Sequence, residues 1–321
     1  MFIEKLLKRN WETPIIPRKW LRFLYRSEIL ESNSDVLLPF EIDFFGMKYS
    51  GNINNVIDFH CFFYGAFEKG QLFFWNDIAS RLYHNKGIFI DIGANVGQHS
   101  IYLSKRASTV HAFEPYETVR KKITEKIELN HLTNIVVHNV GIGHTSELLP
   151  FYKPTGANLG IGTFVENQQN TDNQSDYQLP VVSGDDYFNR QHIDKVDMIK
   201  IDVEGFEKNV MIGLNQTIQK NRPVIVFELG LELDCSFSSH SEIIDHFPSD
   251  YMFFMFDIWD KLGNKNKRKD GIFRKKGIYK LVPFHFDNVK EQTDVVAFPG
   301  EQFKKLFKIV PTIFHLVHTS D

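Results

Sequence analysis

Short apolar runs alternate with segments of helical periodicity from residue 87 onward. The runs at 87–92 (GIFIDI), 108–114 (STVHAFE) and 134–142 (NIVVHNVGI) predict strands. Between them, apolar residues recur at helical spacing over 97–107 and 116–132, which predicts two helices. Strands that alternate with helices in this way are typical of βαβ units, and they predict a parallel sheet.

The same alternation returns after residue 180. Strands are expected at 196–204, 222–229, 251–256 and 293–299, and helices at 205–219 and 240–247. With the three earlier strands, this pattern predicts an α/β chain with a doubly wound, mostly parallel, seven-stranded sheet of the Rossmann-like kind.

The chain before residue 86 follows no such alternation. Pro14 and Pro17 break an N-terminal helical arm, 40–51 has an extended pattern, and a helix is expected from about 70 to 83. We therefore expect an N-terminal extension at 1–85, the main domain at 86–300 and a C-terminal tail at 301–321. A polar stretch at 144–180 interrupts the main domain, and loops of this length are usually functional or mobile.

Composition is that of a soluble globular protein, with 42% hydrophobic and 24% charged residues and a net charge of −3. This balance does not suggest a nucleic-acid partner. Cys61 and Cys235 lie far apart without metal-ligand spacing, which fits a reducing compartment better than a disulfide framework. No apolar run approaches the roughly 20 residues that span a bilayer, and charged residues interrupt the N-terminus, so we expect a cytoplasmic protein.

Two segments are strongly basic. The first thirty residues mix cations with aromatic residues, which suits a membrane interface or an arm packed on the main domain or a second subunit. The segment 261–276 is crowded with Lys and Arg and could receive an anionic acceptor or anionic lipid head groups. Peripheral contact with the inner face of a membrane is therefore the alternative to a purely cytoplasmic location. The sequence predicts no oligomeric state.

The turn after the first predicted strand, DIGANVG, holds Gly93 and Gly97. A dinucleotide fingerprint would place glycine at positions 95 and 98, where this chain has Asn95 and Gln98, so binding of NAD is disfavoured. Asp91 and the backbone of the turn could instead hold the amino-acid end of a cofactor that lacks a pyrophosphate. Glu114 ends the second strand, where an acid accepts hydrogen bonds from ribose hydroxyls.

Together these features are typical of class I S-adenosylmethionine-dependent methyltransferases. At IDIGANVGQHS, AFEP, LPVVSGDDYF and VDMIKIDVEGFE, the chain resembles the FkbM-type methyltransferases over roughly residues 85 to 260. The resemblance implies that S-adenosylmethionine is bound by Asp91, Gly93, Asn95 and Gly97 and, at its ribose, by Glu114. It also places Asn139 to Gly141 near the adenine and Asp202 beside the sulfonium.

Three acids are expected at the ends of two later strands: Asp202, Glu204 and Glu228. Methyl transfer to an alcohol requires removal of its proton, and Glu204 is the first candidate for that general base, with Asp202 the second. Glu228 could orient the substrate or share a divalent cation with Asp202. We do not favour a metal, because the sequence has no dense carboxylate cluster. Glu207 is expected to cap the following helix.

The sequence therefore predicts an O-methyltransferase that acts on a hydroxyl of a sugar, glycan or secondary metabolite. His99 is expected near the cofactor or at the start of a helix, and Asn158 on a polar loop that could close over the substrate. A nicotinamide oxidoreductase on the same fold and a non-catalytic, methyltransferase-like scaffold are the alternatives.

Overall fold

A computed structural model describes Trp20 and the ranges 39–53, 55–152, 162–165, 177–230, 236–258, 279–289 and 292–313. Three predicted features lie outside the described residues: the N-terminal helical arm (except Trp20), Asn158 and the basic segment 261–276. No helix in the described ranges is long and apolar enough to cross a membrane.

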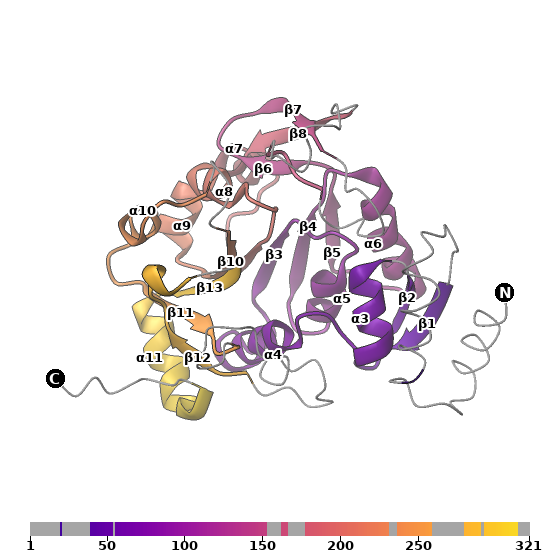
Figure 1. The fold of residues 1–321 in the computed structure, drawn as a ribbon, viewed down its shortest axis with the longest axis horizontal. Coiled ribbons are helices and arrows are strands. Elements are labelled where there is room, and N and C mark those ends of the chain that lie inside the picture. The colour runs from indigo at the N-terminus through magenta and orange to yellow at the C-terminus, as the bar shows by residue number, and fades with distance from the viewer. Residues whose placement is uncertain are drawn as a thin grey trace.

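A central sheet forms the middle of the molecule (Figure 1). Its strand order is β12 (Leu281–Pro283), β11 (Met252–Phe256), β13 (Thr293–Phe298), β10 (Val224–Leu229), β9 (Met198–Ile201), β3 (Ile88–Ile92), β4 (Thr109–Phe113) and β5 (Ile135–His138). The five strands from β10 to β5 are parallel, and β13 runs antiparallel to both of its neighbours. The predicted α/β fold class is confirmed, but the predicted count of seven strands is wrong. The eighth, β12, has three residues, too few for a periodic signal.

The two faces of this sheet pack into two separate apolar cores. Alternate residues of a strand face opposite sides, and accordingly Phe89 belongs to one core and its neighbour Ile90 to the other. Helices α4 (Lys69–Asp77), α5 (Gln98–Ser104) and α11 (Gly300–Ile309) contribute to the first core, and α7 (Gly184–Arg190), α8 (Glu207–Gly213), α9 (Asn215–Asn221) and α10 (His240–Ile244) to the second. The sheet is therefore doubly wound, as predicted.

One predicted strand is in fact divided between the central sheet and a small second sheet. The run 134–142 forms β5 of the central sheet and then β6 (Gly141–Gly143), which pairs with β8 (Tyr177–Ser183) beside β7 (Glu147–Phe151) at the top of Figure 1. The β4–β5 ladder ends at the pair of Phe113 and His138, and the chain then leaves the central sheet.

The predicted helix 205–219 is likewise two helices, α8 and α9, which are separated at Leu214. Gly213, the last residue of α8, packs against the second sheet, since a Cβ there would lie 1.8 Å from the carbonyl oxygen of Gly143. Only glycine fits this close approach.

The described part of the segment before residue 86 packs onto the main sheet. It forms β1 (Pro39–Asp43), β2 (Lys48–Asn52), α3 (Val56–Tyr64), α4 and a π-helical turn (Ile78–Leu82), while α6 (Glu117–Leu129) contacts β2. These elements confirm the expected extended stretch and helix. The ring of Trp75 is fully buried 5.2 Å from that of Phe89. The domain boundary at residue 85 stays a prediction, but it does not separate two cores.

Candidate functional site

The acids and glycines singled out in the sequence gather at one edge of the central sheet. Strands β3, β4, β9 and β10 are parallel, so their carboxyl ends share this edge. Ligands of open α/β sheets bind outside the carboxyl ends of the strands. The arrangement therefore places the predicted site where a ligand is expected.

Gly93 holds the turn after β3 against the end of β9. Its φ is +77°, and a Cβ at this position would lie 1.8 Å from the carbonyl oxygen of Asp202. Its amide donates to the carbonyl oxygen of Phe113 at the end of β4, at 3.1 Å. Only glycine fits such a conformation and approach, so the turn is locked between the two flanking strands.

A pocket opens beside this turn, with about 720 Å³ of empty space that includes its open mouth. Five predicted site residues line it: Gly93, Asn95, Glu114, Asp202 and Glu204. Its other walls include apolar residues that the sequence did not single out, among them Val56, Ile57, Phe67, Phe151 and Phe164. They come from the N-terminal segment and from the chain around the second sheet. Both are distant from the turn in the sequence, so the motif around the turn could not identify them.

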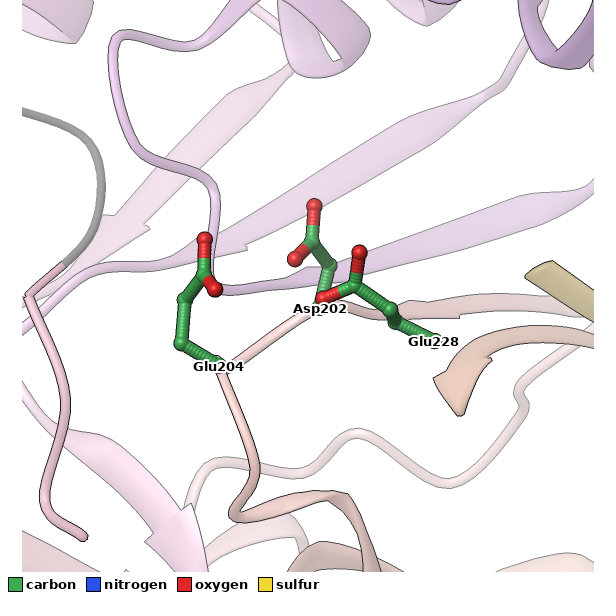
Figure 2. A group of neighbouring side chains, drawn as sticks. All are labelled: Asp202, Glu204 and Glu228. Carbon is green, nitrogen blue, oxygen red and sulfur yellow. The ribbon is translucent and has the colours of Figure 1, made fainter. Parts of the chain in front are cut away.

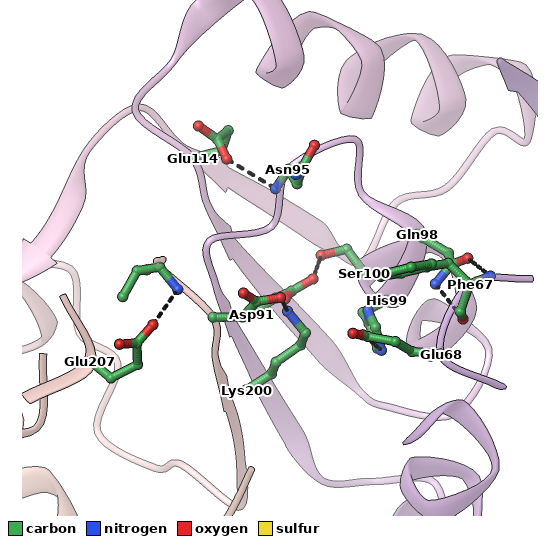
Figure 3. A network of polar contacts seen from close by, with 12 residues as sticks. Phe67, Glu68, Asp91, Asn95, Gln98, His99, Ser100, Glu114, Lys200 and Glu207 are labelled. Atoms are coloured by element: carbon green, nitrogen blue, oxygen red, sulfur yellow. Dashed lines mark hydrogen bonds and ion pairs between the residues drawn. The ribbon is translucent and has the colours of Figure 1, made fainter. Parts of the chain in front are cut away.

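Glu114 is buried at the end of β4 and joins the glycine turn to the next helix. One carboxyl oxygen accepts from the amide of Asn95 at 2.9 Å (Figure 3), and the other accepts from the amide of Tyr116 at 2.9 Å. Burial raises the pKa of Glu114 to about 7, although these two hydrogen bonds oppose the rise. A carboxylate offers about four acceptor positions, so the side chain can still accept hydrogen bonds from a ligand.

Asp91 lies beneath the pocket, fully buried and outside its lining. It accepts from the Ser100 hydroxyl at 2.6 Å (Figure 3). The buried Lys200 binds Asp202 at 2.7 Å, and its pKa is raised because the attraction of Asp202 and Asp91 outweighs the lowering by burial. Lys200 was missed in the sequence, where a lysine inside the buried run MIKI was the available signal. Direct contact between Asp91 and a cofactor stays a prediction.

Three other predicted cofactor residues do not line the pocket. Gly97 begins α5 with a φ of +82°, and a Cβ there would lie 3.0 Å from Ile123 of α6, so it serves helix packing. Asn139 is exposed after β5, and Gly141 begins β6. Their place near an adenine stays a prediction.

Asp202, Glu204 and Glu228 form a cluster of carboxyl groups (Figure 2). One carboxyl oxygen from each lies within 4.8 Å of those of the others. Burial, followed by the charges of Asp202 and Glu207, raises the pKa of Glu204 to about 8. Burial and then the charges of Asp202 and Glu204 raise the pKa of Glu228 well above its usual range.

This cluster supports either of two uses. A carboxyl group with a raised pKa is matched to general-base catalysis near neutral pH. Three carboxyl oxygens at this spacing could also hold a hard divalent cation. The sequence shows no dense run of acids, yet the ends of β9 and β10 bring these three together.

Glu207 lies in the first turn of α8, but it does not cap that helix as expected, because the N-cap has no side-chain hydrogen bond. One of its carboxyl oxygens accepts from the amides of Val203 and Gly205, at 3.0 and 3.2 Å. These bonds support the turn in which Glu204 has a φ of +53°. Glu207 therefore holds the backbone that presents Glu204.

His99 is buried in the first turn of α5. Its Nε2 lies 3.9 Å from a carboxyl oxygen of Glu68, a residue that the sequence did not single out (Figure 3). Burial and then the nearby Lys200 charge hold the pKa of His99 well below its usual range. His99 is therefore a buried, neutral side chain outside the lining of the pocket.

Comparison with known proteins gives matches to methyltransferases. The methyltransferase FkbM domain matches residues 91–255, just over half of the chain. Methyltransferase 1 of Beauveria bassiana is 25% identical over 145 residues, which are 39% of this chain and 57% of that protein. Hexuronic acid methyltransferase AglP of Haloferax volcanii is 28% identical over 137 residues, 42% of this chain and 53% of that protein.

The chain thus spans just over half the length of these curated relatives. Among solved structures, the methyltransferase FkbM of Methylobacillus flagellatus matches with 15% identity and a TM-score of 0.40, over 69% of this chain and 48% of that one.

Proposed function

Because the chain belongs to the FkbM family of methyltransferases, we propose that it is an S-adenosylmethionine-dependent O-methyltransferase whose acceptor is a sugar hydroxyl. The observation that carries this proposal is the pocket that joins the glycine turn and Glu114 to Asp202 and Glu204. This one pocket combines a turn that can hold a cofactor with two carboxyl groups of the acid cluster, those of Asp202 and Glu204.

The residues of the pocket fit this cofactor. The turn at Gly93 has no side chain to fill the space beside the end of β9, and Glu114 keeps acceptor positions for ribose hydroxyls. Asn95 and Glu114 would hold the nucleoside, and the rim near Asp202 would hold the amino-acid end. When bound, S-adenosylmethionine supplies a methyl group on a positively charged sulfur, which departs as a neutral thioether.

Glu204 would act as the general base. Its carboxylate takes the proton of the acceptor hydroxyl while the acceptor oxygen forms its bond to the methyl carbon. Burial and then the negative charges of Asp202 and Glu207 keep the pKa of Glu204 high. A cation held by the same three groups is the alternative use of these atoms, and dialysis against EDTA without loss of turnover would support the base.

The sugar acceptor rests on two supports. One relative, at 28% identity, is named a hexuronic acid methyltransferase, and the cluster offers the carboxyl oxygens that sugar hydroxyls can donate to. Contact with an anionic membrane stays a prediction from the basic segments, and flotation with anionic liposomes at low salt would test it.

Calorimetric titration of the whole chain with S-adenosylhomocysteine tests the proposal, with NAD titrated in parallel. We expect micromolar binding of S-adenosylhomocysteine alone. Binding of NAD alone would favour an oxidoreductase, and binding of neither would favour a scaffold; either result would overturn the proposal.

A further inference from the structure

The turn that carries Glu204 has a backbone conformation that residues with a side chain rarely adopt. Glu204 lies just after β9 and has a φ of +53°, and Gly205 after it has a φ of +98°. Residues other than glycine keep this left-handed conformation only where the surrounding structure holds them in it. The contacts that hold the turn therefore bear directly on where Glu204 lies.

This conformation places the side chain of Glu204 among the other acids of the cluster. Figure 2 shows its carboxyl group near those of Asp202 and Glu228, and one oxygen of each lies within 4.8 Å of the others. Glu204 also lines the cofactor pocket. The direction in which a side chain leaves the backbone depends on φ and ψ, so a relaxed turn would move this carboxyl group.

The hydroxyl group of Thr163 holds the turn at its carbonyl side. Its Oγ1 donates to the carbonyl oxygen of Glu204 at 2.8 Å and accepts from the amide of Val165 at 3.0 Å. A carbonyl oxygen can only accept, so the hydroxyl proton must point toward Glu204. Thr163 is 3% exposed, so little water can reach these atoms to replace the bond.

Thr163 is itself fixed to the end of β7. Its amide donates to the carbonyl oxygen of Tyr152 at 3.2 Å, and the amide of Tyr152 donates to the carbonyl oxygen of Thr163 at 2.9 Å. The two neighbours of Thr163, Gly162 and Phe164, line the cofactor pocket. Thr163 therefore connects the second-sheet wall of this pocket to the turn of Glu204.

Glu207 holds the same turn at its amide side. Its carboxyl group accepts from the amides of Val203 and Gly205, the residues before and after Glu204. The support from Thr163 is different in kind, because it binds a carbonyl oxygen and comes from 41 residues earlier in the chain. Two separate segments thus fix the peptide groups around Glu204.

We propose that Thr163 is a positioning residue for the general base: its hydroxyl holds Glu204 in the left-handed turn that presents the carboxyl group to the pocket. The inference rests on the proposed function, in which Glu204 is that base. The position requires a group that donates to a carbonyl oxygen and accepts from an amide. Serine can do both, whereas valine has the shape of threonine and can do neither.

Hydrogen exchange followed by NMR on the full chain tests the proposal, with the amides of Val203 and Gly205 as reporters of the turn. Thr163→Val should speed their exchange by at least about fivefold, the effect of one lost hydrogen bond. Thr163→Ser should leave it unchanged. The matched control is Thr217→Val, which removes a buried hydroxyl that donates to Asp185 at 2.6 Å in another part of the chain. It should not change the exchange of either reporter.

Methyl transfer separates this inference from the proposed function. With radiolabelled S-adenosylmethionine and glucuronic acid as the acceptor, Thr163→Val should lower kcat by at least about tenfold, because a base out of position is a poor catalyst. Thr163→Ser should restore kcat, and the affinity of both variants for S-adenosylhomocysteine should be that of the unaltered chain. Thr163→Ala, which also lacks the hydroxyl and adds no bulk, serves if the valine variant does not fold.

The exchange measurement needs no acceptor, so the two hypotheses can fail separately. An unaltered chain that does not bind S-adenosylhomocysteine, or does not methylate the sugar, would count against the proposed function alone. Three results overturn this inference: the reporters exchange as slowly in Thr163→Val as in the unaltered chain, Thr163→Ser or Thr217→Val loosens them as much as Thr163→Val, or kcat is the same in Thr163→Val as in the unaltered chain.

Discussion

At the scale of single residues, Glu204 shows how neighbouring side chains prepare a weak acid for catalysis. Burial and the charges of Asp202 and Glu207 raise its pKa to about 8, so most molecules hold it protonated at neutral pH. A general base must be deprotonated, and we therefore expect kcat/KM for methyl transfer to rise with pH through about 8 and then level off. Initial rates across this range check the prediction.

The matched variant is Glu204→Gln. It should bind S-adenosylhomocysteine as the unaltered chain does and lose turnover by about 100- to 10,000-fold, the usual worth of general acid–base catalysis. A rate that is independent of pH in the unaltered chain, or full activity in this variant, would remove Glu204 from the role of base.

Glu114 is the residue on which cofactor affinity should depend. Glu114→Ala removes the acceptor for ribose hydroxyls together with the support of the Asn95 amide. We expect binding of S-adenosylhomocysteine to weaken by about 1.5–3 kcal/mol for each charged hydrogen bond lost, measured by calorimetry. Glu117→Ala, on an exposed residue one turn further on, is the control. Unchanged affinity in Glu114→Ala would place the ribose elsewhere.

The sequence predicted part of this site because five of its residues lie at or just after the carboxyl ends of predicted strands. The parallel sheet alone brings Gly93, Glu114 and the three acids together, because the carboxyl ends of its strands share one edge. Lys200 and Glu68 could not be found in the same way, because their importance depends on contacts between distant segments and on burial. Asp91 lies outside the lining of the pocket, and its direct contact with a cofactor stays a prediction.

At the scale of elements, the glycine turn after β3 packs tightly between the ends of β4 and β9. Gly93→Ala would place a Cβ against the carbonyl oxygen of Asp202 in a left-handed conformation. We expect a loss of about 2–4 kcal/mol in the free energy of unfolding and weaker binding of S-adenosylhomocysteine, measured by urea unfolding and calorimetry. Gly230→Ala is the control, since a Cβ there meets no atom within 4 Å. Equal stability of the two variants would contradict the argument.

The elements themselves were largely predictable, and the errors have physical causes. Short apolar runs predicted each strand of the central sheet that has four or more residues. The run 134–142 divides between two sheets and the helical run 205–219 divides at Leu214, where Gly213 closely approaches Gly143 of the second sheet. Local periodicity carries no information about such a contact, and β12 is too short to have a period.

At the scale of the whole molecule, the described part of the segment before residue 86 shares a core with the main sheet. Trp75→Ala should lower the free energy of unfolding by about 3–5 kcal/mol, and urea unfolding should remain one transition seen by both near- and far-ultraviolet circular dichroism. Trp20→Ala is the matched control because Trp20 is 59% exposed. Two separate transitions would mean that the N-terminal segment folds as an independent unit.

The edge of the central sheet is supplied by two different sets of segments. The cofactor side depends on a backbone contact between Gly93 and Asp202 that tolerates almost no side chain, whereas the far side is built from α4, the end of β11 and the start of β13. A variant library that keeps the cofactor side intact should therefore leave Gly93 unchanged and place its substitutions on the far side, in residues 68–71 and 256–258.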